Sequence, residues 1–149
     1  MVIDVIDIMQ SANGEIAREF EYNPSNDLIV SLPDGKFSAP VRVSAVLWLE
    51  GKNVLADIQL SYNITSSCSR CLESATCEVT HNYFAKYSLH PEEGEYLYKS
   101  GKVDLTASVN EEIVISQPTV VYCKSDCKGL CPVCGANLNN VDCGHTNND

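Results

Sequence analysis

Hydrophobic and polar residues alternate along most of the middle of the chain, which is the pattern of a half-buried β-strand. From Val41 to Leu49 every odd residue is apolar. After the polar turn at residues 50–53, the apolar positions move to the even residues between Val54 and Ile64. A change of parity across a short polar turn predicts a long antiparallel hairpin with one buried face.

Further strands are expected on both sides of this hairpin. Apolar residues occupy the odd positions from Cys77 to Leu89, with His81 as the exception, and predict a third strand. The opening of the chain predicts another pair of strands at residues 2–9 and 15–22, although the alternation there is less regular. Strands that follow one another in this way curl into a strongly twisted sheet or a partly open barrel.

A single helix is expected at about residues 104–117, where Asp104 can cap the first turn and Pro118 ends the helix. Its apolar residues recur at helical spacing, at Leu105, Val109 and Ile113. Residues 23–37 contain Asn, Pro, Asp and Gly, so they predict a loop with at most a short strand at 28–32.

Cysteine is the residue type that points most directly to chemistry. Seven of the eight cysteines and one histidine fall into two sets of four at metal-ligand spacing. The first cysteine set is Cys68, Cys71, Cys123 and Cys127, and the second cysteine set is Cys131, Cys134, Cys143 and His145. Zinc prefers four tetrahedral thiolate or imidazole ligands, and a Cys-x-x-Cys turn supplies two of them. The spacing therefore predicts two zinc sites, and the remaining Cys77 is expected to be a buried small hydrophobe.

Spacing alone also permits other groupings. The Cys-x-x-Cys turns at 68–71 and 131–134 can pair with each other as a zinc ribbon, or one site can form from Cys127, Cys131, Cys134 and Cys143. The two sets are favoured because they close shorter loops, and loop-closure entropy rises with length. Complete ligand sets indicate structural rather than catalytic zinc. The 68–71 turn also lacks the strand-to-helix context that a thiol redox motif needs.

Length and composition fit one globular domain, since 149 residues with 44% hydrophobic and 20% charged residues can bury a single core. Within it we expect a β-rich body over residues 1–122 and a cysteine-rich zinc-binding tail over 123–149, packed on the turn at 68–71. Residues 146–149 are expected to fray. The predicted fold class is α+β, a strongly twisted antiparallel sheet or partly open β-barrel with one helix and C-terminal zinc knuckles.

Charge and the absence of targeting patterns limit the expected location of the protein and its binding partners. The opening residues carry two aspartates and no basic region, and no apolar run approaches the length needed to span a membrane. A cytoplasmic protein with no membrane partner is expected, and there reduced thiols favour metal over disulfides. The net charge of -10 argues against general affinity for nucleic acid, so any RNA contact has to be local. A basic partner protein fits this charge.

Basic residues gather around the first cysteine set. Arg70, Lys124 and Lys128 lie between or directly after its ligands, and Tyr122 adjoins them. A compact basic spot with an aromatic residue beside it can hold RNA phosphates and stack a base. The alternative is that these cations only balance the negative charge of a four-thiolate zinc centre.

Three stretches also carry a likeness to a known family. They are Cys68-Ser-Arg-Cys71-Leu72, the acidic helix ending in Pro118 followed by Cys123, and Asp126-Cys127-Lys128-Gly129-Leu130-Cys131-Pro132-Val133-Cys134-Gly135-Ala136-Asn137-Leu138-Asn139. In these stretches the chain resembles the YceD family of bacterial large-subunit ribosomal RNA accumulation proteins. The resemblance covers the chain in order, from the amino-terminal strands to the last cysteine. Family members often end the run with Cys-x-Cys where this chain has Cys143-Gly-His145. Histidine is also a good zinc ligand, so we expect the site to survive.

The resemblance implies a non-enzymatic role in large ribosomal subunit biogenesis and ribosomal RNA accumulation, through contact with ribosomal RNA or a large-subunit ribosomal protein. The sequence itself shows no nucleophile with its base, no phosphate-cradling Gly-rich loop and no cofactor motif, so no small-molecule substrate is expected. Two functions follow as hypotheses. One is an assembly factor that binds RNA around Arg70, Lys124 and Lys128, and the other is an acidic zinc-stapled module that binds a basic protein without touching RNA.

Overall fold

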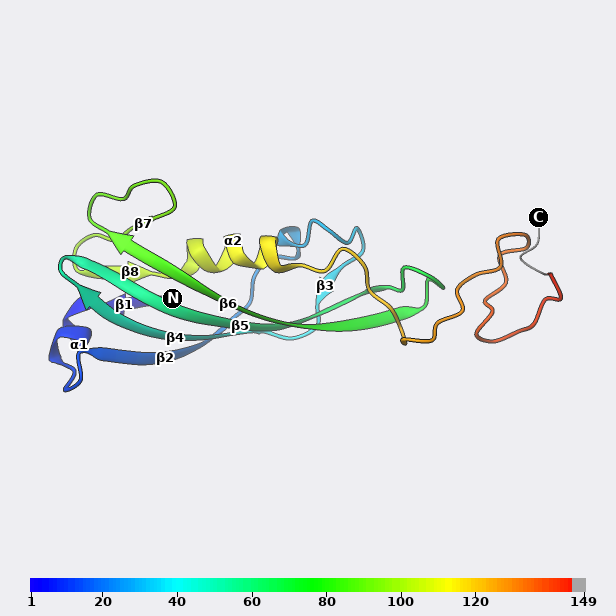
Figure 1. The fold of residues 1–149 in the computed structure, drawn as a ribbon, viewed down its shortest axis with the longest axis horizontal. Coiled ribbons are helices and arrows are strands. Elements are labelled where there is room, and N and C mark those ends of the chain that lie inside the picture. The colour runs from blue at the N-terminus through cyan, green and yellow to red at the C-terminus, as the bar shows by residue number, and fades with distance from the viewer. Residues whose placement is uncertain (146–149) are drawn as a thin grey trace.

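The computed structural model describes residues 1–145 and shows an elongated molecule built on one long sheet (Figure 1). The expected fraying of residues 146–149 lies outside the described residues. The elements are β1 (Val2–Asp4), α1 (Val5–Gln10), β2 (Glu15–Tyr22), the 3₁₀ helix η1 (Asn26–Leu28), β3 (Lys36–Phe37), β4 (Val41–Glu50), β5 (Asn53–Ser67), β6 (Ser74–Ser88), β7 (Tyr96–Leu97), β8 (Lys102–Asp104) and α2 (Thr106–Ser116). No helix within this part of the chain is long and apolar enough to cross a membrane.

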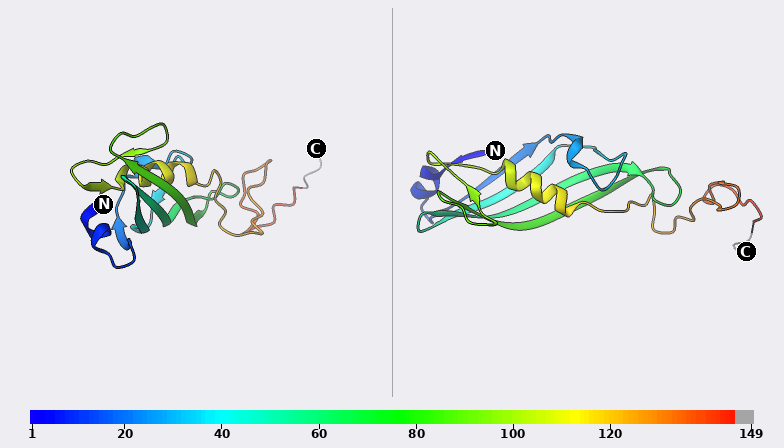
Figure 2. Two further views of the ribbon diagram at one scale, coloured as in Figure 1. Left: turned by 60° about the vertical axis from the view of Figure 1, so that its left-hand side comes forward. Right: turned by 90° about the horizontal axis from the view of Figure 1, so that it is seen from above.

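The main sheet has six strands in the order β2-β4-β5-β6-β7, with β3 paired to β5. Its pairings are antiparallel except for the short pairing of β6 with β7. The strands turn relative to one another along the sheet, as the two views of Figure 2 show. The predicted hairpin and third strand are confirmed. The sheet is open and does not close into a barrel, so the prediction of a twisted sheet holds and the alternative of a partly open β-barrel is wrong.

Burial follows the alternation of the sequence. The odd residues Val41 to Leu47 of β4 and the even residues Val54 to Ile64 of β5 are buried on one face of the sheet. Helix α2 lies over this face (Figure 2), where it buries Val109 and Ile113. The core therefore sits between α2 and the inner face of the sheet.

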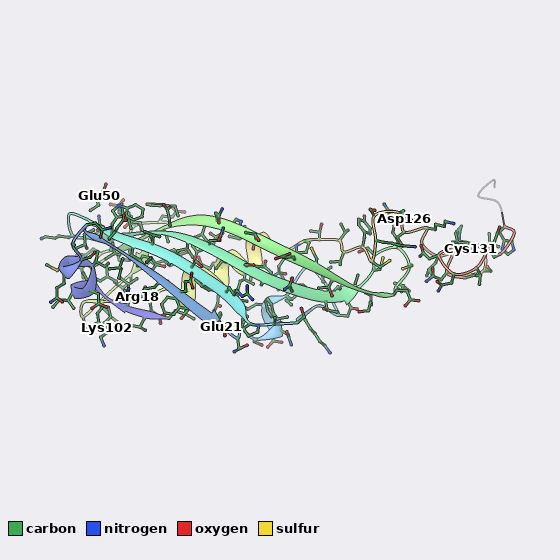
Figure 3. All side chains as sticks on the ribbon, turned by 90° about the horizontal axis from the view of Figure 1, so that it is seen from below. Arg18, Glu21, Glu50, Lys102, Asp126 and Cys131 are labelled. Atoms are coloured by element: carbon green, nitrogen blue, oxygen red, sulfur yellow. The ribbon has the colours of Figure 1, made fainter. Side chains whose placement is uncertain are left out.

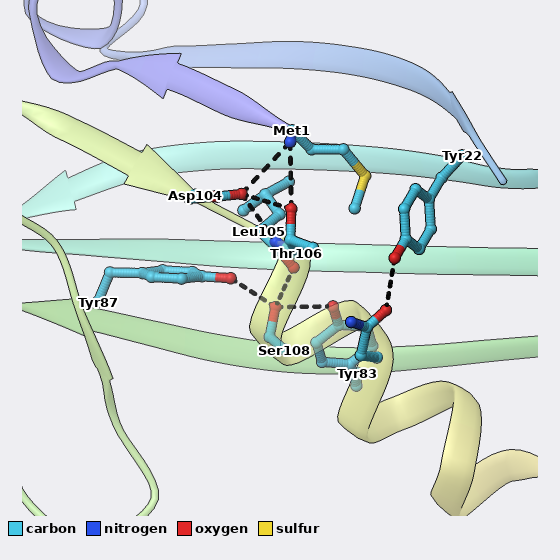
Figure 4. Close-up of polar contacts among 9 residues, drawn as sticks. Met1, Tyr22, Tyr83, Tyr87, Asp104, Leu105, Thr106 and Ser108 are labelled. Atoms are coloured by element: carbon cyan, nitrogen blue, oxygen red, sulfur yellow. Dashed lines mark hydrogen bonds and ion pairs between the residues drawn. The ribbon is translucent and has the colours of Figure 1, made fainter. Parts of the chain in front are cut away.

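Hydroxyl groups fix α2 on the sheet (Figure 4). The hydroxyl oxygens of Tyr87 and Tyr83 lie 2.7 and 3.1 Å from Ser108 Oγ, and Ser108 donates to the carbonyl of Leu105 at 3.0 Å. Tyr22 donates to Asn110 Oδ1 at 3.0 Å. A buried hydroxyl is costly without a partner, so these bonds fix the position of the helix on the sheet.

The prediction of a strand at residues 2–9 is wrong beyond Asp4. Strand β1 ends there, pairs with β8 rather than with β2, and continues directly into α1. Turning into a helix places Ile8 in the main core with no exposed surface. Over so short a stretch the hydrophobic pattern of a helix differs little from that of a strand, so tertiary packing decides which of the two forms.

Two smaller predictions also need correction. The short strand at 28–32 does not form, because the backbone N–H groups of Val30 and Ser31 donate to Gln117 Oε1 at 2.9 and 3.2 Å instead of to a strand. The predicted helix begins at Thr106, while Asp104 belongs to β8. Even so, the Asp104 carboxylate accepts the N–H of Thr106 at 3.0 Å, as a capping residue would.

Candidate metal centre

The first cysteine set forms where the β5–β6 turn meets the segment that follows α2, at the end of the sheet near Asp126 in Figure 3. The turn is closed by hydrogen bonds from Cys68 N to Glu73 O at 2.7 Å and from Leu72 N to Cys68 O at 3.0 Å. Ser69 N donates to Val121 O at 2.8 Å. This last bond brings the chain after α2 beside the turn and so delivers the second pair of ligands.

The spacing of the four sulfurs suits a tetrahedral metal ion. The Sγ atoms of Cys68 and Cys127 lie 3.8 Å apart, and those of Cys71 and Cys123 lie 3.5 Å apart. All four sulfurs lie within 4.8 Å of one another. Zn–S bonds of about 2.3 Å in a tetrahedron put sulfurs about 3.8 Å apart, whereas a disulfide needs about 2.0 Å. The geometry therefore fits a shared ion and excludes disulfides within the set.

The thiols of the first set divide into two that ionise easily and two that do not. Burial raises the pKa of Cys68, but backbone N–H groups, first that of Arg70, outweigh it and lower the pKa to about 6. The side-chain amide of Asn139 lowers the pKa of Cys127. Burial raises the pKa of Cys123 to about 12, with the neighbouring thiols adding to the effect. Without a cation the set resists a fourfold negative charge, and a bound divalent ion would remove that resistance.

The second cysteine set closes on itself within a short loop. The atoms of Cys131, Cys134, Cys143 and His145 that can hold a metal ion lie within 4.8 Å of one another. Cys131 Sγ is 3.8 Å from His145 Nδ1. The backbone N–H groups of Cys134 and Val133 lower the pKa of Cys131 to about 6. His145 is thus in a position to bind the same ion as the three cysteines.

The structure gathers the ligands in these two sets, and the two Cys-x-x-Cys turns do not share one centre. That metal fills both sets stays a prediction. Cys77 belongs to neither set. It is partly buried on β6, where it packs against the core.

Asn139 lies beside the candidate metal centre, and the sequence did not single it out. Its Nδ2 donates to Cys127 Sγ at 3.4 Å, and its Oδ1 accepts the backbone N–H of Lys128 at 2.9 Å. Asn137 orients it by accepting the N–H of Asn139 at 3.0 Å. The only available signal was the Asn-Leu-Asn run itself, because Asn in a tight loop often bonds to nearby backbone.

The four residues predicted to contact RNA differ in whether their side chains already contact other parts of the protein. The guanidinium of Arg70 lies 4.4 Å from the centroid of the Tyr122 ring, and its Nη1 donates to the carbonyl of Cys127 at 3.2 Å. Arg70 is therefore partly engaged in building the site. Lys124 and Lys128 are exposed and form no ion pair within residues 1–145.

A protein of Mycobacterium leprae (strain TN), described only as uncharacterized, is 29% identical to this chain over 118 residues. The aligned part is 74% of this chain and 54% of that protein, so the chain spans about half the length of the curated relative it matches. No solved structure gives a significant match.

The sequence profile of the large ribosomal RNA subunit accumulation protein YceD matches residues 56–149. The match leaves β1 to β4 outside, so it is narrower than the likeness expected from the motifs. It includes both cysteine sets and more than half of the chain. This chain therefore belongs to the YceD family of large ribosomal RNA subunit accumulation proteins.

Proposed function

We propose that this protein is a non-enzymatic, zinc-binding factor that supports the accumulation of large-subunit ribosomal RNA by contacting RNA with its metal-bearing end. The description of the family supports the process. The observation that carries the RNA contact is the convergence of Arg70 and Tyr122 beside the first cysteine set, next to the exposed Lys124 and Lys128. A cytoplasmic location stays a prediction.

Zinc is the proposed ion because thiolate and imidazole ligands in fours are its usual structural environment. Bound in the first set, it would supply folding energy by crosslinking the β5–β6 turn to the chain after α2, and bound in the second it would close the loop from Cys131 to His145. Held in this way, residues 123–145 extend from the end of the sheet as a fixed arm (Figure 1). We propose that arm and sheet together act as one domain.

The basic residues of the metal-bearing end support a local RNA contact. Residues 68–73 and 119–145 contain three basic residues, Arg70, Lys124 and Lys128, and three acidic ones, Glu73, Asp126 and Asp142. The whole chain carries 10 basic and 20 acidic residues. Thiolate ligands add negative charge that bound zinc only partly offsets, so Lys124 and Lys128, rather than a low net charge, would attract the phosphates. An aromatic ring beside cations also suits an unpaired base.

The test is binding of fluorescent fragments of large-subunit ribosomal RNA to the zinc-loaded protein. Lys124→Ala with Lys128→Ala should weaken binding about tenfold and reduce its salt dependence, because two phosphate contacts are lost. The matched control is Lys36→Ala with Lys99→Ala, two exposed lysines of the body. Zinc content has to stay equal in all variants. Equal RNA affinity of the two double variants would refute the proposal.

The second candidate is an acidic interaction module that binds a basic protein and never touches RNA. The net charge of -10 favours it, since complementary charge speeds and orients protein association. Under this hypothesis RNA binding is absent at physiological salt, and both lysine pairs are neutral to function.

A further inference from the structure

The main sheet has a second face that α2 does not cover. Viewed from that side, the strands lie in front and no helix crosses their middle (Figure 3). Strand alternation places four apolar side chains on this face, Val46, Trp48, Leu55 and Phe84, which we call the open-face patch. They are neighbours, because Val46 and Phe84 both pair with Asp57 across β5, and Trp48 pairs with Leu55.

The open-face patch is separate from the core. None of its four residues belongs to the core or packs against it. The centroids of the Trp48 and Phe84 rings lie 6.1 Å apart, and Leu55 is buried. Phe84 is 56% exposed and Val46 is 38% exposed. Single exposed hydrophobic residues are ordinary on a protein surface, but a contiguous apolar group around an aromatic pair marks an interaction site.

A hollow continues the patch across four strands. Its volume is about 710 Å³, and it is lined from Ala17 on β2 through Ser44 and Val46 on β4 and Gln59 on β5 to Phe84 on β6. Amide and hydroxyl groups beside the apolar residues give it hydrogen-bonding partners as well as apolar surface. A shallow hollow of this kind accepts an extended segment rather than a small enclosed ligand.

Carboxylates surround the hollow and outnumber the free cation near it. Glu19, Glu21 and Asp57 are exposed and enter no ion pair in the part of the chain that the structure describes. By contrast, Arg18 pairs with Asp7 at 3.2 Å and Lys86 pairs with Glu95 at 2.6 Å. Arg42, opposite Glu21 in the strand register, is exposed and also enters no ion pair among the described residues, so three free carboxylates face one free guanidinium. The face as a whole therefore presents negative charge around an apolar centre.

We infer that this face docks a basic protein segment that carries apolar side chains. Lysine or arginine would complement Glu19 and Asp57, while apolar side chains would pack on Phe84 and Trp48. RNA does not suit the face, because its phosphates would meet unpaired carboxylates. A second copy of this chain does not suit it either, because a symmetric dimer would set the same carboxylates against each other. The inference adds a protein contact on the sheet to the RNA contact proposed for the metal-bearing end. Each of the two contacts can fail alone.

The first experiment is an NMR titration of the full, zinc-loaded chain with a synthetic peptide that alternates lysine and leucine. Signals of Val46, Asp57 and Phe84 should shift, while those of Arg70 and Tyr122 stay in place. A peptide that alternates lysine and serine has the same charge and should bind about tenfold more weakly, because it cannot fill the apolar centre. Shifts confined to the metal-bearing end, or equal affinity for both peptides, would overturn the inference.

The second experiment compares variants. Phe84→Ser should weaken binding of the lysine–leucine peptide about tenfold or more, as expected for an aromatic residue at the centre of an interface. The matched control is Ile115→Ser, an apolar side chain on α2 that is 70% exposed. Asp57→Lys tests the charge without removing apolar surface and should also weaken binding. RNA binding should be unchanged in Phe84→Ser, which separates this inference from the proposed RNA contact.

Two outcomes identify other occupants and would overturn the inference. One is displacement of the peptide from the open-face patch by an oligonucleotide of single-stranded RNA. The other is a dimer in analytical ultracentrifugation that Phe84→Ser converts to monomer.

Discussion

The side-chain amide of Asn139 donates a hydrogen bond to the sulfur of Cys127, with Nδ2 and Sγ 3.4 Å apart. Asn139 sits in the loop between Cys134 and Cys143 of the second cysteine set, whereas Cys127 belongs to the first. An N–H group that points at a sulfur stabilises the thiolate and fixes its direction, and it lowers the pKa of Cys127. The two sets are thus linked by one side chain.

Replacing Asn139 by Ala should therefore weaken metal binding at the first set, although Asn139 is not a ligand. Loss of such an outer-shell hydrogen bond costs about 10-fold to 100-fold in metal affinity. The measurement is zinc release from the loaded protein in competition with a chromogenic chelator. One of two zinc ions should leave at a lower chelator concentration than in the unchanged protein.

Asn140→Ala is the matched control, because Asn140 is exposed and its side chain forms no hydrogen bond within residues 1–145. Cobalt substitution adds a second readout, since four-thiolate and three-thiolate sites differ in their absorption. If Asn139→Ala and Asn140→Ala release zinc alike, the hydrogen bond to Cys127 contributes nothing to the metal site.

The long strands could be predicted from the sequence because their burial has a period of two over many residues. Strand β5 alternates without a break from Ala56 to Ile64, and no other regular structure gives that pattern. Residues 5–10 offered no such length. There the choice between strand and helix depended on burying Ile8 in a core that distant strands provide.

The candidate metal ligands could be predicted from the sequence, but the contacts around them could not. Metal-ligand spacing is a local property of the chain, so both sets can be proposed from sequence. The contact of Arg70 with Tyr122 and the bond from Asn139 to Cys127 depend on how the turn at 68–71 meets the later segment. The open-face patch could not be predicted for a similar reason, because only the register of β4, β5 and β6 shows that Val46 and Trp48 lie beside Phe84.

Ser108→Ala should destabilise the fold. Ser108 is fully buried, and its Oγ lies within hydrogen-bond distance of the hydroxyls of both Tyr87 and Tyr83. Removing it leaves the buried Tyr87 hydroxyl without this partner, which costs about 1–3 kcal/mol. Urea unfolding followed by circular dichroism measures the loss. Adding Tyr87→Phe should recover part of it, because the stranded hydroxyl is then gone, and strictly additive effects would contradict this account.

Asp34 should make stability depend on pH at the end of β5. Hydrogen bonds from the hydroxyl of Ser66, and then from the hydroxyl and N–H of Ser67, lower the pKa of Asp34 from 3.8 to about 2. A carboxyl group whose pKa is lower in the folded state stabilises that state above its unfolded pKa. The stabilisation is therefore complete above about pH 4 and is lost as pH falls towards about 2.

The measurement is the urea midpoint of the unchanged chain and of Asp34→Asn between pH 2 and pH 6, with hydrogen exchange of the Ser67 N–H as a local probe. Asp34→Asn should be less stable at pH 6, and the difference should shrink below pH 4. Glu93→Gln is the control, since Glu93 is exposed and has no side-chain hydrogen bond among the described residues. A difference that is constant across this range would show that Asp34 acts through packing rather than through its charge.

Leu72→Asn should stabilise the metal-loaded protein, against the usual effect of replacing an apolar residue. Leu72 has a φ of 64°, in the left-handed region that strains a leucine, because the turn requires its N–H to reach the carbonyl of Cys68 at 3.0 Å. The side chain is 66% exposed, so little apolar burial is lost. Asn tolerates this conformation better, so the free energy of unfolding in urea should rise by about 0.5–1 kcal/mol.

The control is Leu97→Asn in β7. Leu97 is 52% exposed and its φ is not positive, so this substitution should give no such gain. If both substitutions destabilise to the same extent, the β5–β6 turn holds Leu72 without strain.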